Sequence, residues 1–347
     1  MKIAIVGGGI IGKLLAFSLV NLGFNITLFE KKEKSCSMIA AGLLSAISEL
    51  DKTDRLIYEL GKRSLQLWPE ILSSLSDKIY YNQAGSLLLS HSLDLAELHR
   101  VMQCISKKIP DKAFPKISIP KFGAAFQEGY FLEDDAAIDA QAVLLALQNY
   151  LIQKEITFIQ ENVLKILPNQ VFLKNKMLHF DWVCDCRGMG AKNNFKTLRG
   201  VRGELIWLKA PLVKLDKPVR ILHPRYHLYI APRPNDIYIL GASEIESEDF
   251  SEISVRTTLE LLTLSFALHP GFGEARIVET FTHCRPTLKS HLPNVIYTNG
   301  FIAVNGLYRY GFLLSPILAF EISQYISKNI SPQFPQIWDS YHAKNYS

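Results

Sequence analysis

The stretch "KIAIVGGGIIGKLLAFSLVNLGFNITLFEK", residues 2–31, decides the fold of this chain. It predicts a short buried strand over residues 2–6, a glycine turn, an apolar-faced helix to about Leu22, and a second strand that ends at Glu30. A strand that leads through glycines into a helix and a second strand is typical of a Rossmann-like α/β domain. The predicted fold class is therefore α/β.

Three glycines stand at the junction of the first strand and the helix, in the pattern Gly7-x-Gly9-x-x-Gly12. Gly7 permits a tight turn, Gly9 lets the backbone approach a pyrophosphate, and Gly12 lets the helix pack close to the strand. Glu30 follows at the distance where an acid binds ribose hydroxyls. The pattern predicts a dinucleotide site and leaves NAD(P) and FAD open. Its predicted contacts are Gly7, Gly9, Ile10, Ile11, Gly12, Glu30 and Lys31.

Composition narrows the class of protein. The 347 residues are 48% hydrophobic and 20% charged, which predicts a globular chain of two domains. The net charge of +5 is scattered, so no nucleic acid partner is expected.

The five cysteines form no CxxC pair, which predicts a reduced, cytoplasmic protein without a metal site. No apolar run reaches about 20 residues, so we expect a soluble protein without a membrane span. A homo-oligomer is possible.

The next stretch, "SCSMIAAGLLSAISELD" (35–51), is small and polar. Small side chains let backbone amides lie against a large planar ligand, although an ordinary loop would have the same composition. From Gly7 to Asp51 the sequence resembles the D-amino-acid oxidase superfamily of flavoproteins, in which this segment wraps the flavin. The resemblance implies FAD as the cofactor, with contacts at Cys36, Ser37, Ala41, Gly42 and Leu43.

Five further motifs extend the resemblance along the chain, and it is strongest to the glycine oxidases of the thiamine pathway. They are "VCDCRGMGAK" (183–192), "GVRGELIWL" (200–208), "LYIAPRPNDIYILGASE" (228–244), "CRPTLKSHLPNV" (284–295) and "NGLYRYGFLLSP" (305–316). The resemblance implies noncovalent FAD, although Cys284 lies beside the site and leaves a covalent link open. Val163 is either a backbone contact of the adenine or plain sheet core. The other implied cofactor contacts are Gly188, Leu307, Tyr308, Arg309, Tyr310, Gly311, Phe312 and Leu313.

The resemblance also implies a discontinuous FAD domain with an inserted substrate domain. We assign 1–80, 137–199 and 296–347 to the FAD domain, and 81–136 and 200–295 to an α+β substrate domain on a mostly antiparallel sheet. Asp139 is predicted to cap a helix over 138–155, and Pro234-Asn235 to turn a hairpin. Ser315 and Pro316 are predicted to begin the last helix, whose N-terminus would point toward the flavin.

Three residues match the family's substrate-binding positions. Arginine forms two parallel bonds to a carboxylate and so fixes its angle as well as its place. Arg285 matches the main carboxylate ligand, and Arg309 the second arginine beside the flavin. Tyr229 matches an active-site tyrosine that adds a bond to the carboxylate. The alternatives are a structural salt bridge for Arg285, bonds to backbone carbonyls for Arg309, and a half-buried strand aromatic for Tyr229.

Two positions depart from the family. Glu244 stands where glycine oxidases commonly have methionine, and Tyr310 where asparagine or histidine is usual. A carboxylate in the pocket would attract the substrate ammonium but is costly to bury unless it is paired or solvated. We therefore expect Glu244 to change substrate preference. The alternative is a glutamate on the rim of the pocket.

The function implied by the resemblance is oxidative deamination of glycine or a small amino acid. A hydride would pass from Cα to the flavin, the imine product would feed thiazole synthesis, and O₂ would be reduced to hydrogen peroxide. No side-chain acid or base is required, so no catalytic residue of that kind is assigned. One alternative is a D-amino-acid dehydrogenase that uses another electron acceptor. A second alternative is a non-catalytic flavin-binding partner protein. An oxidase that modifies a tRNA base is not expected, because the positive charge of the chain is scattered.

Overall fold

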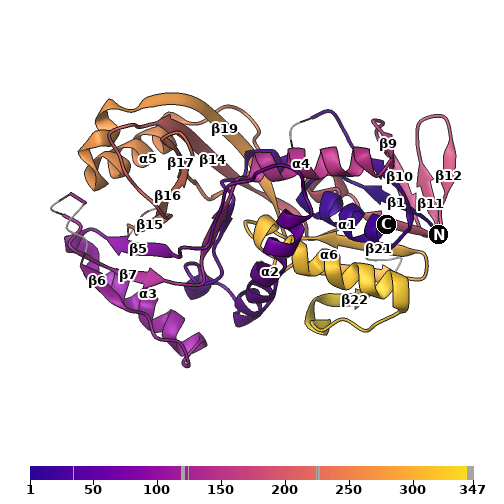
Figure 1. Cartoon of the computed structure of the whole chain (residues 1–347), viewed down its shortest axis with the longest axis horizontal. Helices are drawn as coiled ribbons and strands as arrows, with labels where there is room; N and C mark the ends of the chain where they lie inside the picture. Colours follow the sequence, from indigo (N-terminus) through magenta and orange to yellow (C-terminus); the bar gives the residue numbers. More distant parts are fainter. Residues whose placement is uncertain (34, 119–121, 124, 224, 226, 342–347) are drawn as a thin grey trace.

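The computed structural model describes residues 1–33, 35–118, 122, 123, 125–223, 225 and 227–341, arranged around two large sheets (Figure 1). The first, sheet A, is parallel except for the pair β20–β21. Its strand order is β22 (Trp338–Ser340), β20 (Asn294–Thr298), β21 (Phe301–Asn305), β13 (Trp182–Asp185), β1 (Lys2–Val6), β2 (Asn25–Phe29) and β9 (Thr157–Ile159).

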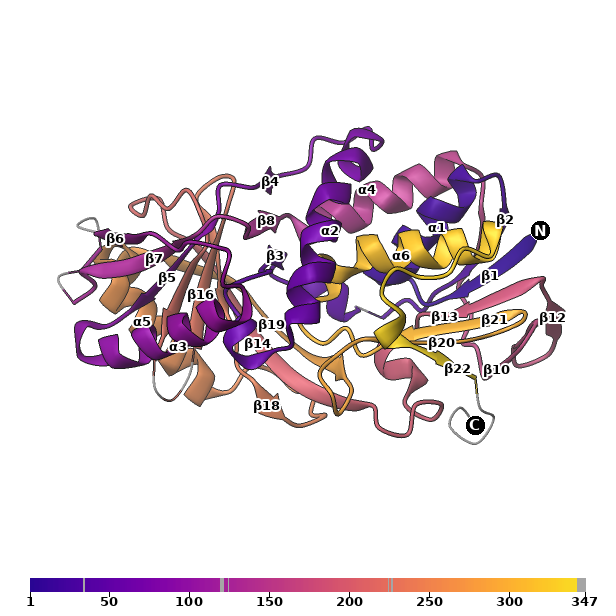
Figure 2. The same ribbon diagram turned by 90° about the horizontal axis from the view of Figure 1, so that it is seen from below.

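Three helices cover one face of sheet A, as Figure 2 shows. They are α1 (Ile10–Asn21), α4 (Ala140–Gln153) and α6 (Gly311–Lys328). The small antiparallel sheet of β10 (Lys165–Leu167), β11 (Gln170–Phe172) and β12 (Met177–His179) packs on the other face. Because both faces are covered, β1 is apolar without alternation, and Ile3, Ala4 and Ile5 are fully buried.

The second sheet, sheet C, is antiparallel except where β15 meets β5. Its order is β18 (Ile245–Glu246), β14 (Arg199–Lys209), β17 (Ile237–Gly241), β16 (His227–Arg233), β15 (Val219–Leu222), β5 (Ser86–Ser90), β7 (Glu128–Leu132) and β6 (Lys116–Ser118), and β19 (Arg276–Thr287) pairs with β14. The helices α3 (Leu95–Lys108) and α5 (Val255–Leu268) belong to this part of the molecule (Figure 1). The predicted fold class, with a mostly parallel and a mostly antiparallel sheet, is confirmed. The residue boundaries of the two domains remain predictions.

Short strands and one long helix lie between the two sheets (Figure 2). The strands β3 (Leu43–Leu44), β8 (Ala136–Ile138) and β4 (Tyr81–Asn82) form a three-stranded sheet of their own. The helix α2 (Arg55–Ser73) packs against α6. These elements are where the chain passes between the two predicted domains.

Two local predictions are confirmed. Asp139 caps α4, because its side chain accepts a hydrogen bond from the Ala142 N–H at 3.0 Å. The predicted hairpin is β16 with β17, and Asn235 and Asp236 in its turn have positive φ angles of 63° and 56°. Both residue types tolerate that left-handed conformation.

The predicted start of the last helix is wrong. The helix α6 begins at Gly311, with Tyr310 as its N-cap, so Ser315 and Pro316 lie within the helix. Pro316 has no N–H to bond the Phe312 carbonyl, four residues back. That carbonyl instead accepts a hydrogen bond from the Trp68 indole at 3.2 Å. A contact from α2 therefore lets the helix continue through the proline.

Candidate active site

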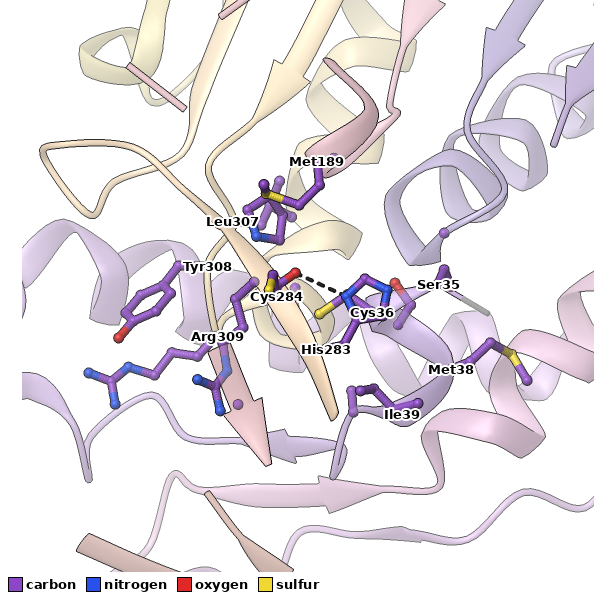
Figure 3. Close-up of a pocket in the computed structure, with 18 of the residues that line it drawn as sticks. Ser35, Cys36, Met38, Ile39, Met189, His283, Cys284, Leu307, Tyr308 and Arg309 are labelled. Carbon is purple, nitrogen blue, oxygen red and sulfur yellow. Dashed lines mark hydrogen bonds between the residues drawn. The ribbon is translucent and has the colours of Figure 1, made fainter. Parts of the chain in front are cut away.

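A single cavity of about 1180 Å³ extends from the glycine turn after β1 to the end of β19. Almost all the predicted site residues line it, from both large sheets. Gly12 and Leu313 are not among the lining residues. In Figure 3, Tyr308 and Arg309 lie together on one side of the cavity, and Ser35, Cys36 and Met38 on the other.

The glycine turn leaves no space for side chains. A Cβ atom on Gly7, whose φ is +122°, would lie 2.4 Å from the Cys186 carbonyl oxygen. A Cβ atom on Gly12 would lie 1.9 Å from the Gly7 carbonyl oxygen. The turn therefore brings the start of α1 directly against β1, as a phosphate-binding turn requires.

The N-terminus of α1 faces the cavity without a side-chain cap. Its N-cap is Gly9, and the Ile10 N–H donates to the Ser37 Oγ at 3.1 Å. Ser37 belongs to the short 3₁₀ helix Cys36–Ile39, within the stretch predicted to wrap the flavin. The remaining amides and the positive end of the helix dipole suit a pyrophosphate.

Glu30 lines the cavity directly after β2 and pairs with Lys13. The Lys13 Nζ lies 3.3 Å from the Glu30 Oε2 and also donates to the Gln148 Oε1. Burial lowers the pKa of Lys13, and the Glu30 carboxylate opposes this. Lys13 holds Glu30 at the position expected for ribose binding, a contact that the glycine pattern did not predict. The turn, the helix end and this acid together fit a dinucleotide such as FAD.

Arg285 and Tyr229 each lie across a glycine of a neighbouring strand. A Cβ atom on Gly203 would lie 2.3 Å from the Arg285 Nη2, and one on Gly241 would lie 2.5 Å from the Tyr229 hydroxyl. The Arg285 Nη1 donates to the Ser243 carbonyl at 3.1 Å. Burial raises the pKa of Tyr229 to about 12, so its hydroxyl stays protonated and able to donate.

Arg309 is held between two carboxylates. Its Nε lies 2.6 Å from the Glu49 Oε2, and its Nη2 lies 3.0 Å from the Glu244 Oε1. The rings of Tyr308 and Tyr310 flank the guanidinium, with centroids 4.9 and 5.9 Å from its Cζ. The charge of Arg309 is thus already paired within the protein. Sequence reasoning did not predict this arrangement.

Glu244 faces the cavity and is paired. The Tyr308 hydroxyl donates to its Oε1, the oxygen that Arg309 also contacts. Burial alone would raise the pKa of Glu244, but Arg309 and the Tyr308 hydroxyl outweigh it and lower the pKa to about 2. Glu244 is therefore a carboxylate at neutral pH and has specific partners inside the pocket.

A second group of charged residues beside Glu49 was also missed. The Arg220 guanidinium donates to the Ser48 carbonyl, and its Nη1 lies 3.6 Å from the Glu49 Oε1. Its Nη2 lies 3.2 Å from the His227 Nδ1. Burial, together with the Arg220 and Lys52 charges, lowers the pKa of His227 to about 3, so the ring is neutral. Glu49 stands in the quoted stretch 35–51, where the available signal was an acid, Glu49 or Asp51, at the end of a run of small and apolar residues.

Two other kinds of site are absent from the part of the chain that the structure describes. No cluster of three or more histidine, cysteine or acidic side chains there could hold a metal ion. No helix within those same residues is long and apolar enough to cross a membrane.

Comparison with known proteins agrees with this geometry. A protein from Rhizobium etli, named as a thiamine biosynthesis oxidoreductase ThiO, is 32% identical over 329 residues and covers 93% of this chain and 96% of its own. The glycine oxidase of Geobacillus kaustophilus is 22% identical over 94% of this chain and 93% of its own. Its crystal structure matches with a TM-score of 0.85 at 21% identity, over 98% of this chain and 99% of its own. The iminodiacetate oxidase of Chelativorans sp. BNC1 also matches with a TM-score of 0.85, at 18% identity over 97% and 99% of the two chains.

The family model of FAD-dependent oxidoreductases, DAO, matches residues 2–325, which include both the glycine turn and Arg309. The chain belongs to the DAO family of FAD-dependent oxidoreductases.

Proposed function

We propose that this protein is an amino-acid oxidase of the glycine oxidase type, which binds FAD noncovalently and deaminates glycine or another small amino acid. One observation carries the proposal. A single cavity holds both the dinucleotide-binding turn and Arg285, whose guanidinium lies across Gly203 and donates from its Nη1 to the Ser243 carbonyl. An arginine presented in this way is suited to a substrate carboxylate.

The protein's own residues would orient the substrate. FAD, when bound, accepts the hydride that leaves Cα of the amino acid, after the ammonium group has lost one proton to water. Arg285 fixes the carboxylate, and the protonated Tyr229 hydroxyl donates a further hydrogen bond to it. These contacts fix the direction of the Cα–H bond, so that hydride transfer takes place within one bound complex in which the substrate is already oriented. The oxidised amine is an imine, which water hydrolyses to an oxo acid and ammonia.

The start of α6 supports the same assignment. Gly311 and Phe312 line the cavity at the N-terminus of this helix. The helix dipole and the first free amides favour negative charge near that end. This suits a cofactor that gains electrons during the reaction.

We also propose that the product serves thiamine synthesis. The 32% identity to the Rhizobium etli protein, over nearly the whole of both chains, supports this role. A strain that lacks its own glycine oxidase of the thiamine pathway would regain growth without thiamine when it expresses this chain.

Peroxide output tests the activity. Holoprotein supplied in air with glycine or small D-amino acids should form hydrogen peroxide and ammonia in equal amounts, and with sarcosine it should form hydrogen peroxide and methylamine. Reduction of an added dye without peroxide would instead identify a dehydrogenase. If neither product forms with any of these substrates, the proposed activity is wrong.

A further inference from the structure

Glu244 presents one open carboxylate oxygen to the cavity. The Tyr308 hydroxyl and the Arg309 Nη2 both contact Oε1. Within the described residues, no donor binds Oε2. The side chain is 39% exposed and lines the cavity, so Oε2 is available to a ligand.

The open carboxylate belongs to the residue that follows a backbone contact of Arg285. The Arg285 Nη1 is bonded to the carbonyl of Ser243, the residue directly before Glu244. A cation and a carboxylate therefore flank the same short segment. The zwitterion of an α-amino acid carries its carboxylate and its ammonium on one carbon, and these two charges are the complement of that pair.

Arg309 already uses two of its three guanidinium nitrogens to contact acids within the protein. Its Nε is paired with Glu49 at 2.6 Å and its Nη2 with Glu244 at 3.0 Å. Its role is to neutralise and fix these two acids, since a buried carboxylate without a partner is costly. Arg309 is thus a positioning residue for Glu244.

We propose that Glu244 binds the substrate ammonium, so that Glu244 and Arg285 together select small zwitterionic α-amino acids over simple carboxylates. The inference rests on the proposed function and assigns a specificity-determining residue to it. Glu244 remains a carboxylate throughout the neutral range. The charged and titratable groups that surround it are Arg309, Tyr308, Arg285, Lys52, His227 and Glu246.

A matched pair of ligands tests the proposal in the holoprotein. Acetate has the carboxylate of glycine but no amine. Its Kd is measured from the change in the flavin spectrum, and that of glycine from the concentration dependence of anaerobic flavin bleaching. In the wild type, glycine should bind at least about tenfold more tightly than acetate, because a charge-assisted hydrogen bond is added. Equal affinities would overturn the proposal without any variant.

Glu244→Gln removes the charge but keeps an oxygen that accepts from Tyr308 and Arg309. The Kd of glycine should rise by about tenfold or more, whereas that of acetate should stay the same or fall. Glu244→Asp keeps the charge and should restore part of the preference for glycine. Equal changes for the two ligands would indicate a structural role and overturn the proposal, as would no change for either.

Failure of the proposed function gives a different result. If glycine does not bleach the flavin, its Kd is read from the static spectrum, and the comparison with acetate still tests Glu244. Turnover and ligand preference are thus separate outcomes of one experiment.

Discussion

The two ends of the cavity are built in different ways. At the cofactor end, the backbone defines the site, through the glycine turn between β1 and α1 and the amides at the start of α1. At the substrate end, side chains from separate elements meet, and Arg309 bridges Glu49 and Glu244 across about 200 residues of sequence. A backbone site is specified by a local pattern, whereas a site made of side chains depends on the whole fold.

The largest effect is expected at the cofactor end. In Gly12→Ala, the new Cβ would lie 1.9 Å from the Gly7 carbonyl oxygen, so the helix must move away from the strand. The variant should be purified without FAD, as measured by its ratio of flavin to protein absorbance. Gly23→Ala is the control for backbone strain without a clash, because Gly23, unlike Gly12, has a positive φ of +83° but no atom within 4 Å of its Cβ position. A yellow Gly12→Ala protein would contradict the backbone account.

A large but selective effect is expected from Arg285. Arg285→Met should keep FAD and lower kcat/KM for glycine by roughly two to three orders of magnitude, because the carboxylate loses its charged partner. Arg285→Lys keeps the charge without the planar fork and should recover only part of the activity. Steady-state kinetics on proteins with matched flavin content provide the measurement. Unchanged kinetics would show that the carboxylate binds elsewhere.

Loss of Arg309 should affect stability more than loss of Arg285. In Arg309→Met, Glu49 and Glu244 lose the cation between them, and the free energy of unfolding should fall by about 3 kcal/mol. Thermal or denaturant unfolding of both variants measures the difference. Acetate should also bind more weakly to Arg309→Met, because the two carboxylates left without a cation repel an anion, and Arg309→Lys should restore that binding. If the Arg309→Met and Arg285→Met variants are equally stable, the pairing of Arg309 with Glu49 and Glu244 does not contribute to stability.

The smallest effect concerns Asp135, which binds the backbone of Ile47 in the segment that leads to Glu49. Asp135 is fully buried; it accepts hydrogen bonds from the Ile47 N–H at 2.9 Å and the Ser86 hydroxyl at 2.7 Å. Burial raises the pKa of Asp135 from 3.8 to about 6, against the effect of these bonds. Because the pKa is higher in the folded state, the wild type loses stability as the pH rises from about 4 through about 6.

Asp135→Asn lacks this titration. Relative to the wild type, its free energy of unfolding should therefore improve by about 2 kcal/mol between pH 4 and pH 7. Denaturant unfolding at a series of pH values measures this. Parallel pH curves for the two proteins would mean that the pKa of Asp135 is the same in the folded and unfolded states.

The contrast between the two ends also explains what the sequence predicts. Gly7 to Gly12 and Glu30 form a local pattern, so the dinucleotide turn and the α/β class follow from it. The order of the motifs places Arg285, Arg309 and Tyr229 in one site. The partners of Arg309 do not follow, because Glu49 and Glu244 reach it only through tertiary packing.

The start of α6 shows the same limit. A Ser-Pro pair commonly opens a helix, and the local pattern at 315–316 favours that position. The indole of Trp68, 244 residues before Phe312, accounts for the difference, since it satisfies the carbonyl that the proline leaves open. A contact between residues so far apart in the chain cannot be predicted from the local sequence.

The central claim is that the glycine turn and Arg285 together bring a small amino acid to a bound flavin. Mixing holoprotein with glycine in the absence of oxygen tests this most directly. The account predicts that the yellow colour of the flavin bleaches fully with glycine and returns on admission of air. A protein with a full complement of FAD that keeps its colour with glycine, sarcosine and small D-amino acids would contradict it.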